Sequence, residues 1–338
     1  AVGLLKARIA RLKEKQEQRG KGGKAGEGYS VRKTGDGTVI LLGFPSVGKS
    51  TLLNKLTNQD SEVGAYAFTT LTCIPGLLEY KHAKIQILDV PGVVKGAARG
   101  TGRGKEVLSV MRSADLGLIV VDVNHPEHLD ILRKEVYDTN IRLDKKKPDV
   151  KIKRTAKGGI CIGTTIKLKK LTKDTIKAIF KEFSLNNADV VIRTNIIDDE
   201  LIDCIEANRV YIPSLIVLNK VDMVSAERLE EVKKLVKPDL CISCKTGLQI
   251  DKLKDMIFDK LNLIRLFLKE PGKKADLKEP LIMFKGCSIK DVCEKLHRDF
   301  VSKFKFARVT GKSAKFPAQK LSIKHVMMDG DVLELHID

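Results

Sequence analysis

The sequence predicts an α/β fold, and three observations point to it. Residues 38–42 (TVILL) form a short β-branched and aliphatic run, which is typical of a strand buried on both faces. A glycine-rich segment follows, and the sequence from residue 50 (STLLNKLTN) then predicts a helix. Further hydrophobic runs at 85–88, 116–122 and 214–218 end in polar or charged residues. We therefore expect buried strands alternating with helices.

The glycine-rich segment fits the pattern G-x-x-x-x-G-K-[ST] at every fixed position. Its glycines let the backbone curl so that N–H groups point at phosphate oxygens, and the helix N-terminus adds positive potential. Lys49 places a full charge near the β- and γ-phosphates, and Ser50 is positioned to hold Mg²⁺. This segment predicts a nucleoside triphosphate site formed by Gly43, Pro45, Ser46, Val47, Gly48, Lys49, Ser50 and Thr51.

A second phosphate-side motif, Asp89-Val90-Pro91-Gly92, comes about forty residues after the first, at the end of the 85–88 strand. A carboxylate there reaches Mg²⁺ through water, and the backbone N–H of Gly92 can sense the γ-phosphate. The loop 93–106 (VVKGAARGTGRGKE) is rich in glycine and basic residues, so we expect a switch that orders with the γ-phosphate.

Two later motifs predict the base. The 214–218 strand leads into Asn219-Lys220-Val221-Asp222, where the Asp222 carboxylate can accept N1–H and N2–H₂ of guanine, a pair that adenine lacks. Lys220 packs over the ring, and Asn219 ties the loop to the phosphate loop. Ser243, Cys244 and Lys245 occupy the position where a backbone N–H meets guanine O6. The predicted nucleotide is GTP.

Composition adds a partner class. The 338 residues carry a net charge of +19, which points to a polyanion such as nucleic acid. Positive charge gathers at residues 1–33, with ten Lys/Arg against three Glu, and at 145–157, with seven against one Asp. Seven cysteines without repeating spacing suggest reduced thiols, and Cys241-x-x-Cys244 lacks the second ligand pair of a zinc site.

Five motifs, GFPSVGKST, YAFTTLTCIPG, DVPG, NKVD and SCKTG, occur in this order, and with them the chain resembles the developmentally regulated GTP-binding proteins. These are an Obg-type branch of the P-loop GTPases, and the resemblance covers nearly the whole chain. It implies GTP or GDP with Mg²⁺ as cofactors. By resemblance Thr70 joins Ser50 and Asp89 at the metal, and Lys49, Thr70 and Gly92 are the catalytic positions.

The resemblance also implies four modules. A basic helical arm and linker would occupy residues 1–36, and the GTPase domain 37–143 with 207–270. Residues 144–206 would form an inserted α+β domain resembling ribosomal protein S5 domain 2. Residues 280–338 would form a β-grasp TGS domain, with a helix presenting Val292, Leu296 and Phe300 on one face. The segment before it, KEPGKKADLKEP, has the composition of a domain boundary.

Two departures bear on mechanism. Ras-type GTPases place a glutamine after the D-x-x-G glycine to orient water, but this chain has Val93 there, so we expect slow intrinsic hydrolysis. Arg99 and Arg103 in the switch loop could assist in cis, but the general basicity of a flexible loop is the better explanation for them. Many Obg-type relatives have Asn where this chain has Ser46, which puts potassium-dependent activation in doubt.

The resulting prediction is a cytoplasmic GTP-hydrolysing switch that acts on ribosomes or rRNA and is controlled by a regulatory protein. We expect no membrane partner, because no apolar run could span a bilayer, and no sequence-specific DNA recognition. Two alternatives stay open: a ribosome-assembly GTPase, and an RNA-binding scaffold in which GTP is mainly a structural ligand.

Overall fold

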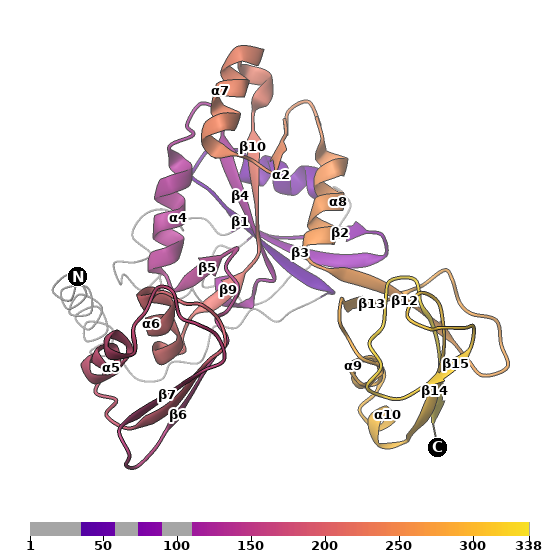
Figure 1. Cartoon of the computed structure of the whole chain (residues 1–338). Coiled ribbons are helices and arrows are strands. Elements are labelled where there is room, and N and C mark those ends of the chain that lie inside the picture. The colour runs from indigo at the N-terminus through magenta and orange to yellow at the C-terminus, as the bar shows by residue number, and fades with distance from the viewer. Residues whose placement is uncertain (1–34, 58–73, 90–109, 338) are drawn as a thin grey trace. The chain divides into compact units, whose positions relative to one another are not determined.

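A computed structural model describes residues 35–57, 74–89 and 110–337 (Figure 1). The N-terminal arm and the switch segments with Thr70, Gly92, Val93, Arg99 and Arg103 lie outside these ranges. None of the helices in the described ranges combines the length and apolar character needed to cross a membrane.

The central sheet has six strands in the order β11-β10-β4-β1-β3-β2. The strands are β1 (Gly37–Leu42), β2 (Ile74–Tyr80), β3 (Ala83–Asp89), β4 (Leu116–Asp122), β10 (Ser214–Asn219) and β11 (Leu240–Cys241). All pairs are parallel except β2 with β3. Both β1 and β4 are buried along their whole length, as their continuous aliphatic runs predict. The carboxyl ends of the parallel strands therefore meet at one edge, where the polar motifs lie.

Helices and one 3₁₀ turn follow several of these strands in the chain. They are α2 (Lys49–Leu56), α4 (His128–Asp138), the 3₁₀ turn η2 (Val221–Met223), α7 (Ala226–Val236) and α8 (Ile250–Lys260). Leu52, Leu53 and Leu56 of α2 are buried in the main hydrophobic core with the β1, β3 and β4 side chains. This packing fixes the start of α2 directly after the glycine-rich loop.

The inserted segment folds as an α+β unit around its own core. Strands β6 (Val150–Arg154), β7 (Ile160–Thr164) and β8 (Ala188–Ile192) form a sheet in the order β6-β8-β7. Helices α5 (Lys173–Glu182) and α6 (Asp198–Glu206) supply the rest of the core. A parallel pair, β5 (Ile141–Leu143) and β9 (Val210–Ile212), flanks the unit in sequence. The predicted α+β character of this segment is confirmed.

The C-terminal sheet has five strands in the order β13-β12-β16-β14-β15. They are β12 (Leu263–Lys269), β13 (Leu281–Phe284), β14 (Phe304–Thr310), β15 (Gln319–Leu321) and β16 (Val332–Ile337), with helices α9 (Ile289–Leu296) and α10 (Asp299–Ser302). One detail of this sheet differs from expectation. The predicted GTPase domain extends to residue 270, but β12 pairs with β13 and β16 and buries Ile264 and Leu266 in the C-terminal core.

The supposed boundary segment 269–280 therefore connects two neighbouring strands of one sheet. Its Pro/Gly/Lys composition marks a loop, and a loop inside a domain has the same composition as one between domains. The predicted single helix through Phe300 is also wrong, because His297 adopts an extended conformation that ends α9 at Leu296. Val292 is fully buried, while Leu296 and Phe300 pack at the margin of the core.

Candidate functional site

The phosphate loop joins β1 to α2, and only glycine fits two of its positions. Gly48 has φ 97°, and a Cβ there would lie 2.5 Å from Asn219 Nδ2. A Cβ on Gly43 would lie 2.6 Å from the Val120 carbonyl oxygen. Gly48 is the N-cap of α2 and makes no side-chain capping bond. The first N–H groups of α2 are thus available to an anion, as the motif predicts.

Lys49 spans this loop. Its ammonium donates hydrogen bonds to the carbonyl oxygens of Gly43 (3.0 Å) and Phe44 (2.9 Å). Burial lowers the pKa of Lys49, and the nearby Asp89 carboxylate opposes that shift. A cation that is held against the loop and partly desolvated has a stronger interaction with a phosphate than one in bulk water.

The magnesium residues predicted from two distant motifs are in contact. Ser50 Oγ donates a hydrogen bond of 3.1 Å to Asp89 Oδ2, although the residues are 39 positions apart. Asp89 is 4% exposed, and its Oδ1 has no hydrogen-bond partner among the described residues. A hydroxyl and a carboxylate with a spare buried oxygen form the hard-oxygen donor set that suits Mg²⁺.

The guanine loop is tied to the phosphate loop through Asn219, which is 1% exposed. Its Nδ2 donates to the Val47 carbonyl oxygen at 2.8 Å, and its Oδ1 accepts the Cys244 N–H at 3.1 Å. Lys220 adds a bond from its Nζ to the Ser46 carbonyl oxygen at 2.8 Å. One buried amide therefore links three of the predicted motifs.

The residues predicted to read the base lie in the segments that follow β10 and β11. Asp222 is exposed within η2, two residues after Lys220, and Lys245 is exposed as well. Ser243 Oγ accepts the Thr246 N–H at 3.2 Å, which shapes the turn that follows β11. Pro45, Ser46 and Thr51 are exposed around the phosphate loop. The proposed site roles of Thr70 and Gly92 stay predictions, because both residues lie outside the described ranges.

The two cysteines of the C-x-x-C pair differ in exposure, since Cys241 is half-buried and Cys244 is buried. Cys241 and Cys244 are free thiols, and neither belongs to a cluster of potential metal ligands within the described residues. Burial raises the pKa of the Cys244 thiol to about 11, which keeps it neutral. The Cys244 N–H bonds to Asn219 of the N-K-x-D motif, and the role of the pair in a guanine loop stays a prediction.

Sequence reasoning assigned no role to Asp122, the last residue of β4. Its Oδ2 accepts a bond from Lys220 Nζ at 2.7 Å, and its Oδ1 accepts bonds from the backbone and side chain of Asn124. Burial favours a higher pKa for Asp122, but these hydrogen bonds outweigh it and lower the pKa. The signal was present in the sequence: Asp122, like Asp89, is a carboxylate at the end of a buried strand.

A P-loop GTPase is defined by a mostly parallel sheet with a glycine-rich phosphate loop, a strand-end carboxylate bonded to the loop serine, and an N-K-x-D motif bonded to that loop. Family models agree along the chain. Residues 38–154 match a family described as 50S ribosome-binding GTPase, 157–263 match the C-terminal region of that domain, and 264–337 match the TGS domain.

Relatives give a closer assignment. An uncharacterised GTP-binding protein of Methanocaldococcus jannaschii is 53% identical, over 99% of this chain and 87% of that protein. Developmentally-regulated GTP-binding protein 1 of Xenopus laevis is 43% identical, and protein 2 of Homo sapiens is 40% identical, each over 99% of this chain and 92% of the relative. The chain belongs to the developmentally regulated GTP-binding protein family and binds guanine nucleotide.

Among solved structures, the YchF GTPase of Schizosaccharomyces pombe aligns with a TM-score of 0.49 at 14% identity, over 90% of this chain and 99% of that chain. The family assignment rests on the sequence relatives, whose similarity extends through the inserted and C-terminal segments.

Proposed function

We propose that this chain is a Mg²⁺-dependent GTP hydrolase that works as a switch on ribosomes. The observation that carries the hydrolase part is the Ser50–Asp89 contact beside the Lys49-spanned loop. Mg²⁺ at Ser50 and Asp89 would neutralise charge on the β- and γ-phosphates. Lys49 and the α2 N-terminus hold the same phosphates, so these residues position the substrate and stabilise its developing charge.

Slow turnover without help is part of this proposal. Val93, next to the D-x-x-G glycine, has no group that could hydrogen-bond to the attacking water. A ribosome or a regulatory protein would then supply the missing orientation. The test is multiple-turnover phosphate release with GTP, measured with and without ribosomes. A rate that stays at zero under both conditions would favour the scaffold alternative, in which GTP is only a structural ligand.

The ribosome part rests on charge placement. Lys145, Lys146, Lys147, Lys151, Lys153, Arg154 and Lys157 are all exposed. On β6, Val150 and Ile152 pack on the inserted core, so Lys151 and Lys153 face the opposite side of the sheet. Lysines on an edge strand also prevent aggregation, which is the plain explanation. The matching family is described as ribosome-binding, and a phosphate backbone is the polyanion that dispersed lysines fit.

The experiment is ribosome co-sedimentation across a salt series. One variant reverses Lys145, Lys146, Lys147, Lys151 and Arg154 to Glu, and a control reverses five exposed lysines elsewhere: Lys234, Lys237, Lys252, Lys274 and Lys278. We expect the first variant alone to lose affinity and to show a flatter salt slope, with GTP binding unchanged in both. Equal curves for the two variants would remove the inserted domain as the RNA contact. Binding to precursor subunits rather than mature ribosomes would favour an assembly factor.

A further inference from the structure

We propose that His125, Glu127 and His128 form a binding site for a divalent transition metal. Their ligand atoms lie within 4.8 Å of one another, in a group that no nucleotide motif includes. Two imidazoles and one carboxylate are a donor set that suits Zn²⁺, Co²⁺ or Ni²⁺ rather than Mg²⁺, which prefers oxygen ligands alone.

The three side chains come from the ordered turn after β4 and the first residue of α4, His128. The His125 N–H donates to the Asp122 carbonyl oxygen at 3.0 Å, and the His128 N–H donates to the His125 carbonyl oxygen at 3.3 Å. Pro126 restricts the backbone between them. Because the turn is already folded, a metal would not have to order it on binding.

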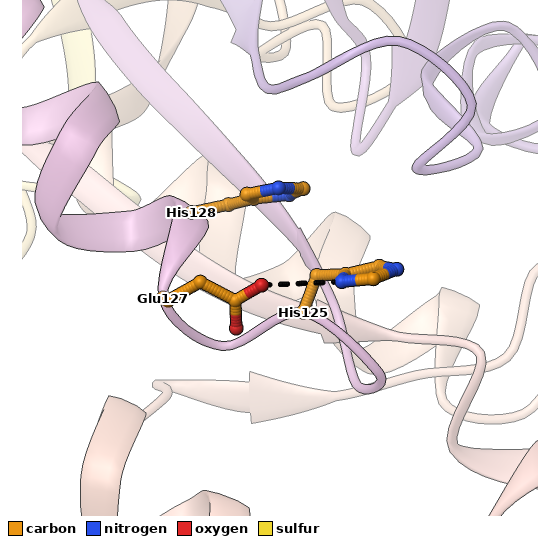
Figure 2. A group of neighbouring side chains, drawn as sticks. All are labelled: His125, Glu127 and His128. Atoms are coloured by element: carbon orange, nitrogen blue, oxygen red, sulfur yellow. Dashed lines mark hydrogen bonds and ion pairs between the residues drawn. The ribbon is translucent and has the colours of Figure 1, made fainter.

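The arrangement of the His125 and His128 rings shows which change of conformation metal binding requires. Figure 2 shows the His125 and His128 rings one above the other, with the Glu127 carboxylate directed at His125. The ring centroids are 5.0 Å apart with planes inclined by 20°, and His125 Nδ1 lies 3.1 Å from Glu127 Oε1. The lone pairs of an imidazole lie in the plane of its ring, so two stacked, nearly parallel rings direct them within separate planes, and one ring must turn before both can ligate one ion.

His125 is the ring that can turn, because its side chain is 56% exposed. His128 is held more firmly: it stacks on Phe44 of the phosphate loop, with centroids 4.0 Å apart and planes inclined by 15°. Among the described residues, the buried His128 Nδ1 has no hydrogen-bond partner. Two ligands of a tetrahedral zinc lie roughly 3.3 Å apart, given bonds of about 2.0–2.1 Å. Rotation of the His125 and Glu127 side chains can bring the ligand atoms to that separation.

The test is a Co²⁺ titration of the nucleotide-free full-length chain, followed by visible absorption, with excess Mg²⁺ to occupy the Ser50–Asp89 position. We expect one bound Co²⁺ without a thiolate band in the near ultraviolet. His125→Gln and Glu127→Gln should each weaken binding about tenfold or more. Asp89→Asn should leave it unchanged.

The matched control is His297→Gln, since His297 is a surface histidine beside a carboxylate, Asp299, at 3.7 Å. Equal Co²⁺ affinities for His125→Gln, His297→Gln and the parent would overturn the proposal. So would absence of binding in the parent, or a thiolate band, which would assign the ion to a cysteine such as the exposed Cys161.

Discussion

Ser50 and Asp89 are joined by a hydrogen bond of 3.1 Å between Ser50 Oγ and Asp89 Oδ2. The contact connects the start of α2 to the end of β3, because β1 and β3 are adjacent parallel strands whose carboxyl ends share one edge of the sheet. In this contact the hydroxyl donates to one carboxylate oxygen, Oδ2. When Mg²⁺ binds, we expect this bond to be replaced by contacts to the ion.

Replacing either partner should strongly slow Mg²⁺-dependent hydrolysis. Ser50→Ala removes the hydroxyl and Asp89→Asn removes the charge while it keeps the shape, so each should lower the rate by about 10²–10³-fold. Lys49→Ala should have an effect of similar size. Phosphate release at saturating GTP measures this, and Ser322→Ala, a change at an exposed serine of the C-terminal domain, is the control. A normal rate in Asp89→Asn would contradict the assignment.

Asn219→Ala should weaken nucleotide binding and lower thermal stability together. The change leaves the Val47 carbonyl oxygen and the Cys244 N–H without their buried partner, and each such loss costs about 1–3 kcal/mol. Calorimetric GDP titration and thermal unfolding measure the two effects, with the exposed Asn186→Ala as control. A variant that lost GDP affinity but kept its melting temperature would show that Asn219 does not hold the loops together.

Asp222→Asn should change the base preference. A carboxylate accepts two guanine N–H donors, whereas an amide presents one donor, which suits the 2-oxo group of xanthine. We expect GTP affinity to fall strongly and xanthosine triphosphate to bind in its place. Competition against a fluorescent nucleotide measures both. If the variant bound GTP as tightly as the parent, Asp222 would not read the base.

The sequence predicted those parts of the site whose signal is local. A strand, a glycine loop and a helix N-terminus follow one another in the chain, and N-K-x-D follows its own strand, so each motif could be located without tertiary contacts. The pairing of Asp122 with Lys220 and the stack of His128 on Phe44 could not be located in this way. They join residues from different strand ends, and only the strand order brings them together.

The predicted start of the C-terminal domain was wrong for a related reason. The assignment of β12 depended on which sheet its backbone groups join, and a run such as LIRLFLK is compatible with any buried strand. Its parallel pairing with β16, more than sixty residues later, places β12 in the C-terminal sheet. Composition could not, because it reports how exposed a loop is and not which strands the loop connects.

Thiol reactivity should follow burial. Burial raises the pKa of Cys204, Cys244 and Cys287 to about 11 each. Because thiolate is the reactive form, these thiols should alkylate slowly at pH 8, whereas the exposed Cys161 should react first. The neutral thiol is favoured by folding, so its stabilising effect is complete below about pH 8.5 and declines as pH rises toward 11.

Iodoacetamide labelling followed by peptide mass spectrometry measures each site, with urea-unfolded protein as the reference in which all thiols react. Labelling of Cys244 as fast as Cys161 would contradict both its burial and its place in the guanine loop.

A buried ion-pair network should control the stability of the segment that carries the inserted unit. Arg142 of β5 donates to Asp203 of α6 through Nε at 2.7 Å and Nη2 at 2.9 Å, and Arg209 Nε donates to the same carboxylate at 2.8 Å. All three side chains are 4–5% exposed. The Arg142 guanidinium also lies 3.7 Å from the centre of the Tyr137 ring.

Asp203→Ala should therefore be strongly destabilising. It leaves two buried guanidinium groups without the carboxylate they share, and removing one partner of a buried pair costs about 3–5 kcal/mol. Asp149→Ala is the matched control, because it breaks the Asp149–Arg193 pair, whose side chains are 56% and 46% exposed, and such a pair contributes about 0–1 kcal/mol. Hydrogen exchange of the β6–β8 amides should accelerate much more in Asp203→Ala than in the control. Similar exchange in both variants would mean that packing of the inserted core, rather than the shared carboxylate, holds this segment.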